Sequence, residues 1–146
     1  MTHYRTLEDA LVGEGLFSRQ DLARVLAQRN GLRGGLGWSL VDAGLVSEEK
    51  LAQAFARLYE LAVVDLSTTL IEPGVTDAFP LERMRRDLFL PLRREGNRLV
   101  VAVADPGNVL LRDDLVQWNG GPVDLVVTTR AALRDRLGRV DASSGS

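Results

Sequence analysis

The sequence predicts a mixed α+β (α/β) protein with two subdomains and a short tail. Residues 1–60 are expected to form a helical tandem repeat of about four helices, packed with a small three-stranded α/β subdomain over residues 61–140. Residues 141–146 are small and polar, and we expect them to be a disordered tail. Two observations carry this prediction: a helical unit that is written twice in the first half, and strand-like apolar runs between turn residues in the second half.

The repeat becomes visible when residues 6–29 are laid over residues 35–58. Nine of the 24 aligned positions are identical at a constant offset of 29, where ordinary residue usage would give roughly two or three by chance. A tandem repeat of this period indicates a duplicated supersecondary unit whose copies share one core. Paired copies can also form a pseudo-symmetric site for a two-fold symmetric ligand.

Each copy of the repeat is expected to contain two helices. In the first copy, an apolar helical stripe ends at Gly15, a natural left-handed helix stop, and Ser18 begins the next helix as its N-cap. In the second copy, Gly44 and Ser47 occupy the matching positions. The helices that follow the two serines carry apolar residues at helical spacing, which predicts a buried face on each.

After residue 60 the apolar pattern changes to that of strands. Residues 89–93 and 98–104 are predicted strands joined by a hairpin-length turn, and residues 123–128 are a third. A predicted helix over 109–118 separates the last two strands, which favours a parallel, right-handed crossover. A further extended run is expected at 62–66. Short helices are expected at 73–78 and 80–86, and a last helix at 130–138 after the cap residue Thr129.

Composition excludes several classes of protein. The chain has 146 residues, is 45% hydrophobic and 26% charged, and contains no cysteine, so disulfides and thiol chemistry are excluded. Its net charge of −2 argues against a nucleic-acid binder. The N-terminus does not resemble a signal peptide, and no apolar run reaches the roughly 18 residues of a membrane span. We therefore expect a cytoplasmic protein without direct membrane insertion.

No catalytic or metal-binding set stands out in the sequence. There is no Gly-Lys-Ser/Thr phosphate-binding run, and the single lysine, Lys50, falls within a predicted helix. His3 is the sole histidine, and Asp113-Asp114 lacks further oxygen ligands at metal-binding spacing. The sequence thus predicts a protein that is not an enzyme and holds no metal and no cofactor.

Six arginines between residues 83 and 98 form the most basic part of the chain. Glu82, Asp87 and Glu95 are interleaved with them. A solvated charged face is therefore the favoured interpretation, ahead of a phosphate site or a surface for an acidic partner.

The order of motifs resembles the N-terminal domain of type II secretion and type IV pilus assembly ATPases. That family carries in tandem the run Leu-Gly-x-x-Leu-Val-x-x-Gly-Leu-Val, followed by a spaced Leu and Phe, which residues 36–55 match here. Downstream similarities lie at 64–66, 79–80, 90–92 and 99–106. The resemblance implies a non-catalytic regulatory module that docks onto, or controls, a secretion, pilus or motility apparatus through a protein partner.

One branch of this family binds cyclic di-GMP. The resemblance implies that, in this branch, each copy of the motif binds one half of the dinucleotide. A cyclic di-GMP sensor is therefore the alternative function. The implied ligand-binding residues are mainly apolar, with one arginine for polar contact: Leu7, Leu11, Val12, Gly15, Leu16, Leu22, Leu26, Arg33, Leu36, Gly37, Leu40, Val41, Gly44, Leu45, Leu51 and Phe55.

The polar ends of the motif differ from those of the branch that binds cyclic di-GMP. In that branch each motif begins Arg-Leu-Gly and ends in Gln, whereas the opening positions are Thr6 and Gly35 here and the first glycine is replaced by Glu8. The closing positions are Arg29 and Leu58. A carboxylate beside a dianionic ligand costs Coulomb energy. The sequence therefore predicts that cyclic di-GMP binds weakly or not at all.

Overall fold

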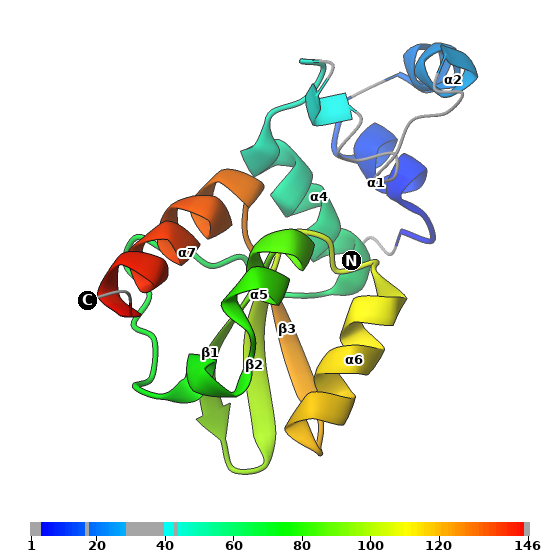
Figure 1. Ribbon diagram of the computed structural model, residues 1–146. Coiled ribbons are helices and arrows are strands. Elements are labelled where there is room, and N and C mark those ends of the chain that lie inside the picture. Colours follow the sequence, from blue (N-terminus) through cyan, green and yellow to red (C-terminus); the bar gives the residue numbers. More distant parts are fainter. Residues whose placement is uncertain (1–3, 17, 29–39, 43, 145–146) are drawn as a thin grey trace. The chain divides into compact units, whose positions relative to one another are not determined.

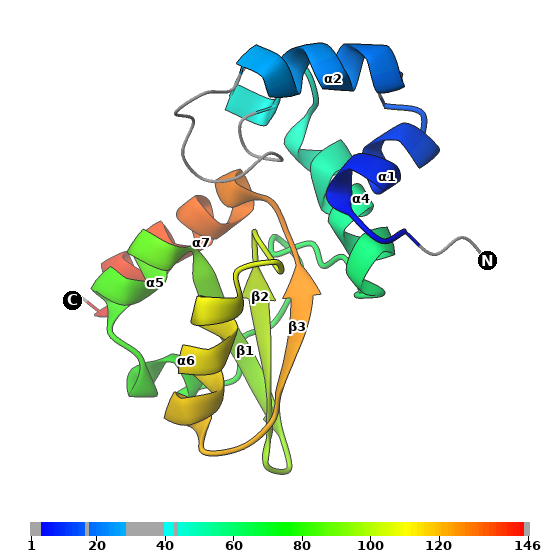
Figure 2. The ribbon, with the colours of Figure 1, turned by 90° about the vertical axis from the view of Figure 1, so that its right-hand side faces the viewer.

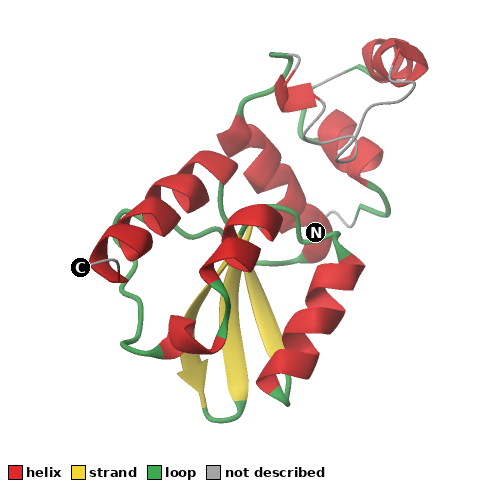
Figure 3. Cartoon of the chain, viewed as in Figure 1, coloured by secondary structure: helices red, strands yellow, loops and turns green. Residues whose placement is uncertain are grey.

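The structure is a computed structural model that describes residues 4–16, 18–28, 40–42 and 44–144. The chain divides into two compact units, Met1–Leu61 and Ala62–Ser146. Among the described residues, the first unit is helical and the strands all lie in the second unit (Figure 3). The predicted mixed α+β class is confirmed.

The first unit contains helices α1 (Leu7–Gly13), α2 (Arg19–Gln28) and α4 (Glu48–Tyr59), labelled in Figure 1. Residues 40–42 are also helical. The helices predicted after the two serines are thus confirmed. Of the predicted first helix of the second copy, residues 40–42 are described, and the part before residue 40 lies outside the described residues.

One apolar cluster holds the first unit together. Its buried members come from both copies of the repeat, and they are Ala10, Leu11, Leu22, Leu40 and Ala54. Half-buried apolar side chains surround them, among them Leu7, Val12, Leu16 and Val46. The two copies therefore share one core, as the repeat period predicts.

A polar network joins the end of α1 to α4. The Tyr4 hydroxyl donates to Glu14 at 2.6 Å, and Arg57 lies 3.5 Å from the same carboxylate. The hydrogen bond to Glu14, with a smaller contribution from burial, raises the pKa of the Tyr4 hydroxyl. The Tyr4 ring lies so close to Gly13 that a Cβ there would come within 2.4 Å of it, so this packing requires glycine.

The second unit is built on a three-stranded sheet of order β1-β2-β3. β1 (Phe89–Glu95) pairs antiparallel with β2 (Arg98–Val103). β2 pairs parallel with β3 (Val123–Val127), and helix α6 (Val109–Asn119) forms the crossover between them. The predicted hairpin and the parallel pairing of the last two strands are both confirmed.

Helices cover one side of this sheet. α5 (Leu81–Asp87), α6 and α7 (Arg130–Ser144) lie on the same side of it in Figure 2. β2 is the central strand, and it is buried on both faces from Leu99 to Val103. The chain before the sheet contributes further buried apolar side chains, which are Leu66, Val75 and Phe79.

Three details of the second unit differ from the prediction. The segment expected as a helix at 73–78 is a short 3-10 turn, η1 (Val75–Ala78), because Gly74 enters it from the left-handed region. The register of β1 shifts between Pro91 and Arg93, and an edge strand tolerates such a proline since its missing N–H faces away from the ladder. The hairpin turn is also tighter than expected, with β1 ending at Glu95 and β2 beginning at Arg98.

The end of the chain is a further correction. We expected the last helix to end at 138 and the chain from Asp141 to be disordered, but α7 continues to Ser144. After Gly138 the sequence has no glycine or proline before residue 145, so nothing in it stops the helix. Residues 145–146 lie outside the described residues.

Arg83 ties α5 to α6. Its guanidinium donates to Asp87 on its own helix and, at 2.6 Å, to Asp114 on α6. It also lies 4.8 Å from the centre of the Trp118 ring, a cation–π contact. Burial raises the pKa of the Asp87 carboxyl, but hydrogen bonds from Arg83 and Arg86 outweigh it, so the pKa is lowered overall.

Replacing Asp87 is expected to remove part of the acid sensitivity of folding. Because the pKa of Asp87 is lower in the folded state, its contribution to stability is present above the unfolded-state pKa and is lost as the pH falls through the folded-state value. Asp87→Asn should therefore destabilise the fold by about 1–2 kcal/mol at pH 7 and much less at about pH 2. Urea unfolding at both pH values measures this. Asp77→Asn, at an exposed acid in η1, is the control, and an equal loss at both pH values would contradict the prediction.

Candidate functional site

The candidate site is the tandem motif, and its first glycine ends α1 in a Schellman motif. Gly15 has a φ of +78°. Its N–H donates to the carbonyl of Val12 at 3.0 Å, and the N–H of Leu16 donates to the carbonyl of Leu11 at 3.0 Å. These two bonds satisfy carbonyls that a helix end otherwise leaves unpaired, and the left-handed residue between them favours glycine.

The second copy repeats this geometry 29 positions later. Gly44 has a φ of +75°. Its N–H donates to Val41 at 2.9 Å, and the N–H of Leu45 donates to Leu40 at 2.9 Å. The Leu-Val-x-x-Gly-Leu core of the motif is therefore the sequence of a helix C-cap, in which each named residue has a defined place.

The next part of the motif is a helix N-cap. The Ser18 hydroxyl accepts from the N–H of Asp21 at 3.1 Å, and the Ser47 hydroxyl accepts from the N–H of Lys50 at 3.2 Å. The serine at the same position in both copies thus begins α2 and α4. Both predicted N-caps are confirmed.

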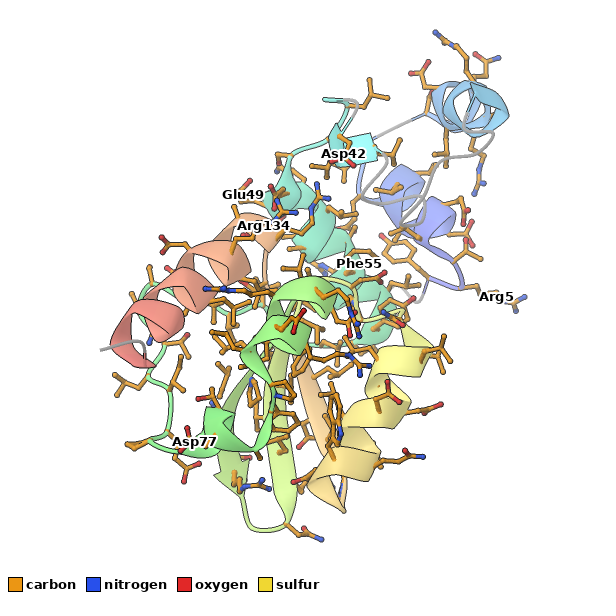
Figure 4. The ribbon with its side chains drawn as sticks, viewed as in Figure 1. Arg5, Asp42, Glu49, Phe55, Asp77 and Arg134 are labelled. Atoms are coloured by element: carbon orange, nitrogen blue, oxygen red, sulfur yellow. The ribbon has the colours of Figure 1, made fainter. Side chains whose placement is uncertain are left out.

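Half of the apolar site residues that the structure describes lie in the protein interior. Leu11, Leu40 and Leu51 are fully buried, and Leu22 and Phe55 are nearly so. The other described apolar members are half-buried, namely Leu7, Val12, Leu16 and Val41. Leu45 is the exception, with 49% of its surface exposed. Figure 4 shows Phe55 on α4 among the side-chain sticks.

The side-chain exposure of four predicted site residues, Leu26, Arg33, Leu36 and Gly37, lies outside what the structure describes. Arg33, Leu36 and Gly37 lie outside the described residues, as does Gly35 at the opening of the second motif. Leu26 belongs to the helical backbone of α2. The arginine proposed for polar contact therefore stays a prediction.

The polar residues that open the first motif have structural roles. The Thr6 hydroxyl accepts from the N–H of Asp9 at 3.1 Å and so caps α1. Glu8 lies in the first turn of α1, where the helix dipole favours an acid. Arg5, one position upstream of the expected arginine, is exposed and projects away from the ribbon (Figure 4). Sequence reasoning missed the Thr6 cap, although threonine three positions before an acid was its signal.

At least four of the six arginines between residues 83 and 98 lie beside acids, namely Arg83, Arg86, Arg93 and Arg98. Besides the contacts of Arg83, Arg93 lies 2.9 Å from Glu95. Arg98 donates two hydrogen bonds to Asp124 across β2 and β3, at 2.8 and 2.5 Å. This pairing agrees with a solvated charged face.

Two searches of the described residues bear on other kinds of site. No three His, Cys, Asp or Glu side chains in the described ranges come together in a way that suits a metal ion. The described helices include none with the length and apolar character needed to cross a bilayer.

Comparison with known proteins places the chain in a family. The MshEN domain matches residues 59–146, which is more than half of the chain. The chain belongs to the MshEN domain family. This match falls on the α/β unit and the end of α4, whereas the tandem motif lies before it.

Relatives of this MshEN chain extend the similarity over nearly its whole length. It is 33% identical over 141 residues to the type IV pilus assembly ATPase PilB of Myxococcus xanthus, covering 95% of this chain and 25% of that protein. It is also 35% identical over 130 residues to PilB of Thermus thermophilus, covering 88% of this chain and 15% of that one. The chain thus spans a quarter or less of these two ATPases.

Solved structures show the same fold. A structure of MshE with cyclic di-GMP (cdg) superposes with a TM-score of 0.82 at 27% identity, covering 93% of this chain and 99% of that one. The N-terminal domain of XpsE superposes with a TM-score of 0.77 at 27% identity, covering 91% and 92%. The resemblance to the N-terminal domains of pilus and secretion ATPases is confirmed.

The two glycines of the tandem motif, Gly15 and Gly44, should be required for stability because of their left-handed backbone conformation. A Cβ at Gly15 or Gly44 would meet no atom within 4 Å, so alanine there adds only the cost of the left-handed conformation. Gly15→Ala and Gly44→Ala should each lower the free energy of unfolding by about 1–2 kcal/mol in urea titrations.

Gly138→Ala is the matched control for this prediction. Gly138 lies within α7 and also has no atom within 4 Å of an added Cβ. Alanine at this helical position should leave stability unchanged or raise it by about 0.5–1 kcal/mol. If all three substitutions had the same effect, the C-cap role of the motif glycines would be wrong.

Proposed function

We propose that this chain is a non-catalytic regulatory and docking module of a pilus or secretion ATPase. It acts in the cytoplasm through a protein partner of that apparatus. The observation that carries the proposal is that the chain corresponds to a 141-residue segment making up a quarter of a PilB ATPase. Within its 146 residues there is no Gly-Lys-Ser/Thr run that would bind a nucleotide phosphate.

The burial of the motif leucines accounts for their presence without a ligand. Leu11, Leu40 and Leu51 have no exposed surface, so they stabilise the fold whether or not a ligand is present. Thr6, at the position of the first motif arginine, caps α1. The buried leucines and Thr6 therefore have structural roles that do not require a bound dinucleotide.

A cyclic di-GMP sensor is the second candidate function. It is favoured by the similarity to MshE, whose structure was solved with cyclic di-GMP and matches 93% of this chain. The ligand would contact the half-buried and exposed apolar residues of the motif, such as Val12, Leu16 and Leu45. Thr6 lacks the positive charge of the arginine that the binding branch has at this position. Glu8 would place a carboxylate beside the dianionic ligand where that branch has glycine.

A chimera tests the regulatory role. This chain replaces the matching segment of Myxococcus xanthus PilB, and ATP hydrolysis is compared with that of PilB lacking the segment. A regulatory module should change the rate by about fivefold or more, while the isolated chain should hydrolyse no ATP. A flexible linker of equal length in place of the segment is the control, and a chimera with the linker's rate would count against regulation.

Calorimetric titration with cyclic di-GMP tests the second candidate. Losing the charge-assisted contacts of two motif arginines costs roughly 1.5–3 kcal/mol each, so we expect micromolar or weaker affinity. A nanomolar dissociation constant would make the sensor the main function instead.

Restoring the motif sharpens this test. The variant Thr6→Arg, Glu8→Gly, Gly35→Arg should bind cyclic di-GMP clearly better than the parent if the apolar residues still form a ligand platform. Because Thr6→Arg also removes the α1 cap, the matched control is Thr6→Ala, Glu8→Gly, Gly35→Ala, which loses the same cap. If neither variant binds cyclic di-GMP detectably, the motif serves only to pack the fold.

A further inference from the structure

The outward face of α6 carries a row of four exposed residues. Val109 is 64% exposed and Val116 is 38% exposed. Arg112 and Asp113 lie between them and are exposed as well. Leu111 faces the opposite way and is buried, so these four residues, the α6 stripe, point away from the sheet. α6 lies on the side of its unit that faces the viewer in Figure 2.

The two charges of the α6 stripe lack a partner in the helix. The side chains of Arg112 and Asp113 make no ion pair or hydrogen bond with any residue that the structure describes. As sequence neighbours they do not face each other. No residue three or four positions from either one carries the opposite charge. An intact helix with two exposed valines and two solvent-exposed charges of opposite sign, neither with a partner in the described part of the chain, is thus available for an outside contact.

The α6 stripe complements a reversed copy of itself. A two-fold axis that passes midway between residues 112 and 113 places two α6 helices antiparallel. Val109 then meets Val116 of the second copy, and Arg112 meets Asp113 of the second copy. Each contact occurs twice, which is the property of an isologous interface.

We propose that the α6 stripe is a docking surface for a second copy of this chain, which forms a two-fold symmetric dimer through antiparallel α6 helices. A different partner would need its own matching row of valines and charges, whereas a second copy supplies that row by symmetry. A helix of 11 residues is about 16 Å long and offers less than the roughly 800 Å² per partner of a standard interface. The dimer is therefore weak and depends on concentration. It does not depend on the proposed regulatory function.

Charge reversal tests the pairing. Sedimentation of the full chain should show association that rises between about 10 μM and 1 mM. In a dimer of Arg112→Asp, or of Asp113→Arg, both ion pairs become like-charge pairs, so association should fall about tenfold or more. An equimolar mixture of the two variants places Asp opposite Arg at both positions, and association should return. Arg134→Asp, the same change at an exposed residue of α7, should behave like the parent.

Two results would overturn the proposal. One is a parent chain that stays monomeric up to about 1 mM, and the other is a mixture of the two variants that associates no better than either alone. A cysteine test gives an independent readout of the register, because the chain has no native cysteine. Val109→Cys mixed with Val116→Cys should cross-link on oxidation, and Val109→Cys mixed with Arg134→Cys should not. Equal cross-linking of both mixtures would also contradict the proposal.

Discussion

Each copy of the tandem repeat depends on one left-handed glycine. Gly15 and Gly44 let the chain leave one helix and reach the N-cap serine of the next within three residues. At each turn two backbone N–H groups satisfy carbonyls of the helix that ends, and a serine hydroxyl accepts from the helix that begins. A turn this short fixes which leucines on either side of it face inward. The shared core of the first unit follows from that constraint.

The tandem motif therefore encodes a turn, whatever else it does. The Schellman geometry assigns leucine, valine and glycine to C3, C2 and C′, and the following leucine to C″. Glycine at C′ is favoured in any protein that makes this turn, and an apolar contact between C3 and C″ frequently accompanies it, whether or not a ligand binds. The residues that distinguish a binder of a dianionic ligand from a scaffold are the polar ones, and at the first opening position this chain has Thr6, which caps α1.

The elements with strong local signals could be predicted from the sequence. Gly15, Ser18 and their counterparts carry their own backbone preferences, and the three strands are short runs rich in apolar residues between turn residues. Features that depend on distant residues could not be predicted. Arg83 meets Asp114 across 31 positions, and neither residue has a local pattern that indicates the other. Left-handed Leu88 ends α5 without the glycine that would have signalled it.

The candidate site was predictable to a similar degree, and for the same reason. The buried leucines of the site follow from helical spacing, so their burial could be expected from the pattern alone; they are Leu11, Leu22, Leu40 and Leu51. Thr6 caps α1 through a hydrogen bond from the N–H of Asp9, and the local signal for this role is a threonine three positions before an acid. The contact of Glu14 with Tyr4 and Arg57 joins the segment before the repeat to both copies of it, and no spacing in the sequence indicates it.

The two motif turns are alike in backbone and different in surroundings. Leu16 packs against the shared cluster, whereas Leu45, at the same place in the second Schellman motif, leaves 49% of its surface exposed. Because both turns use the same hydrogen bonds, this difference cannot come from the turn itself. It arises from what each copy has beside it, since a shared core gives the two leucines different neighbours. A ligand or partner that contacts the two motif turns therefore meets the same backbone geometry twice, with a more exposed leucine at the second turn.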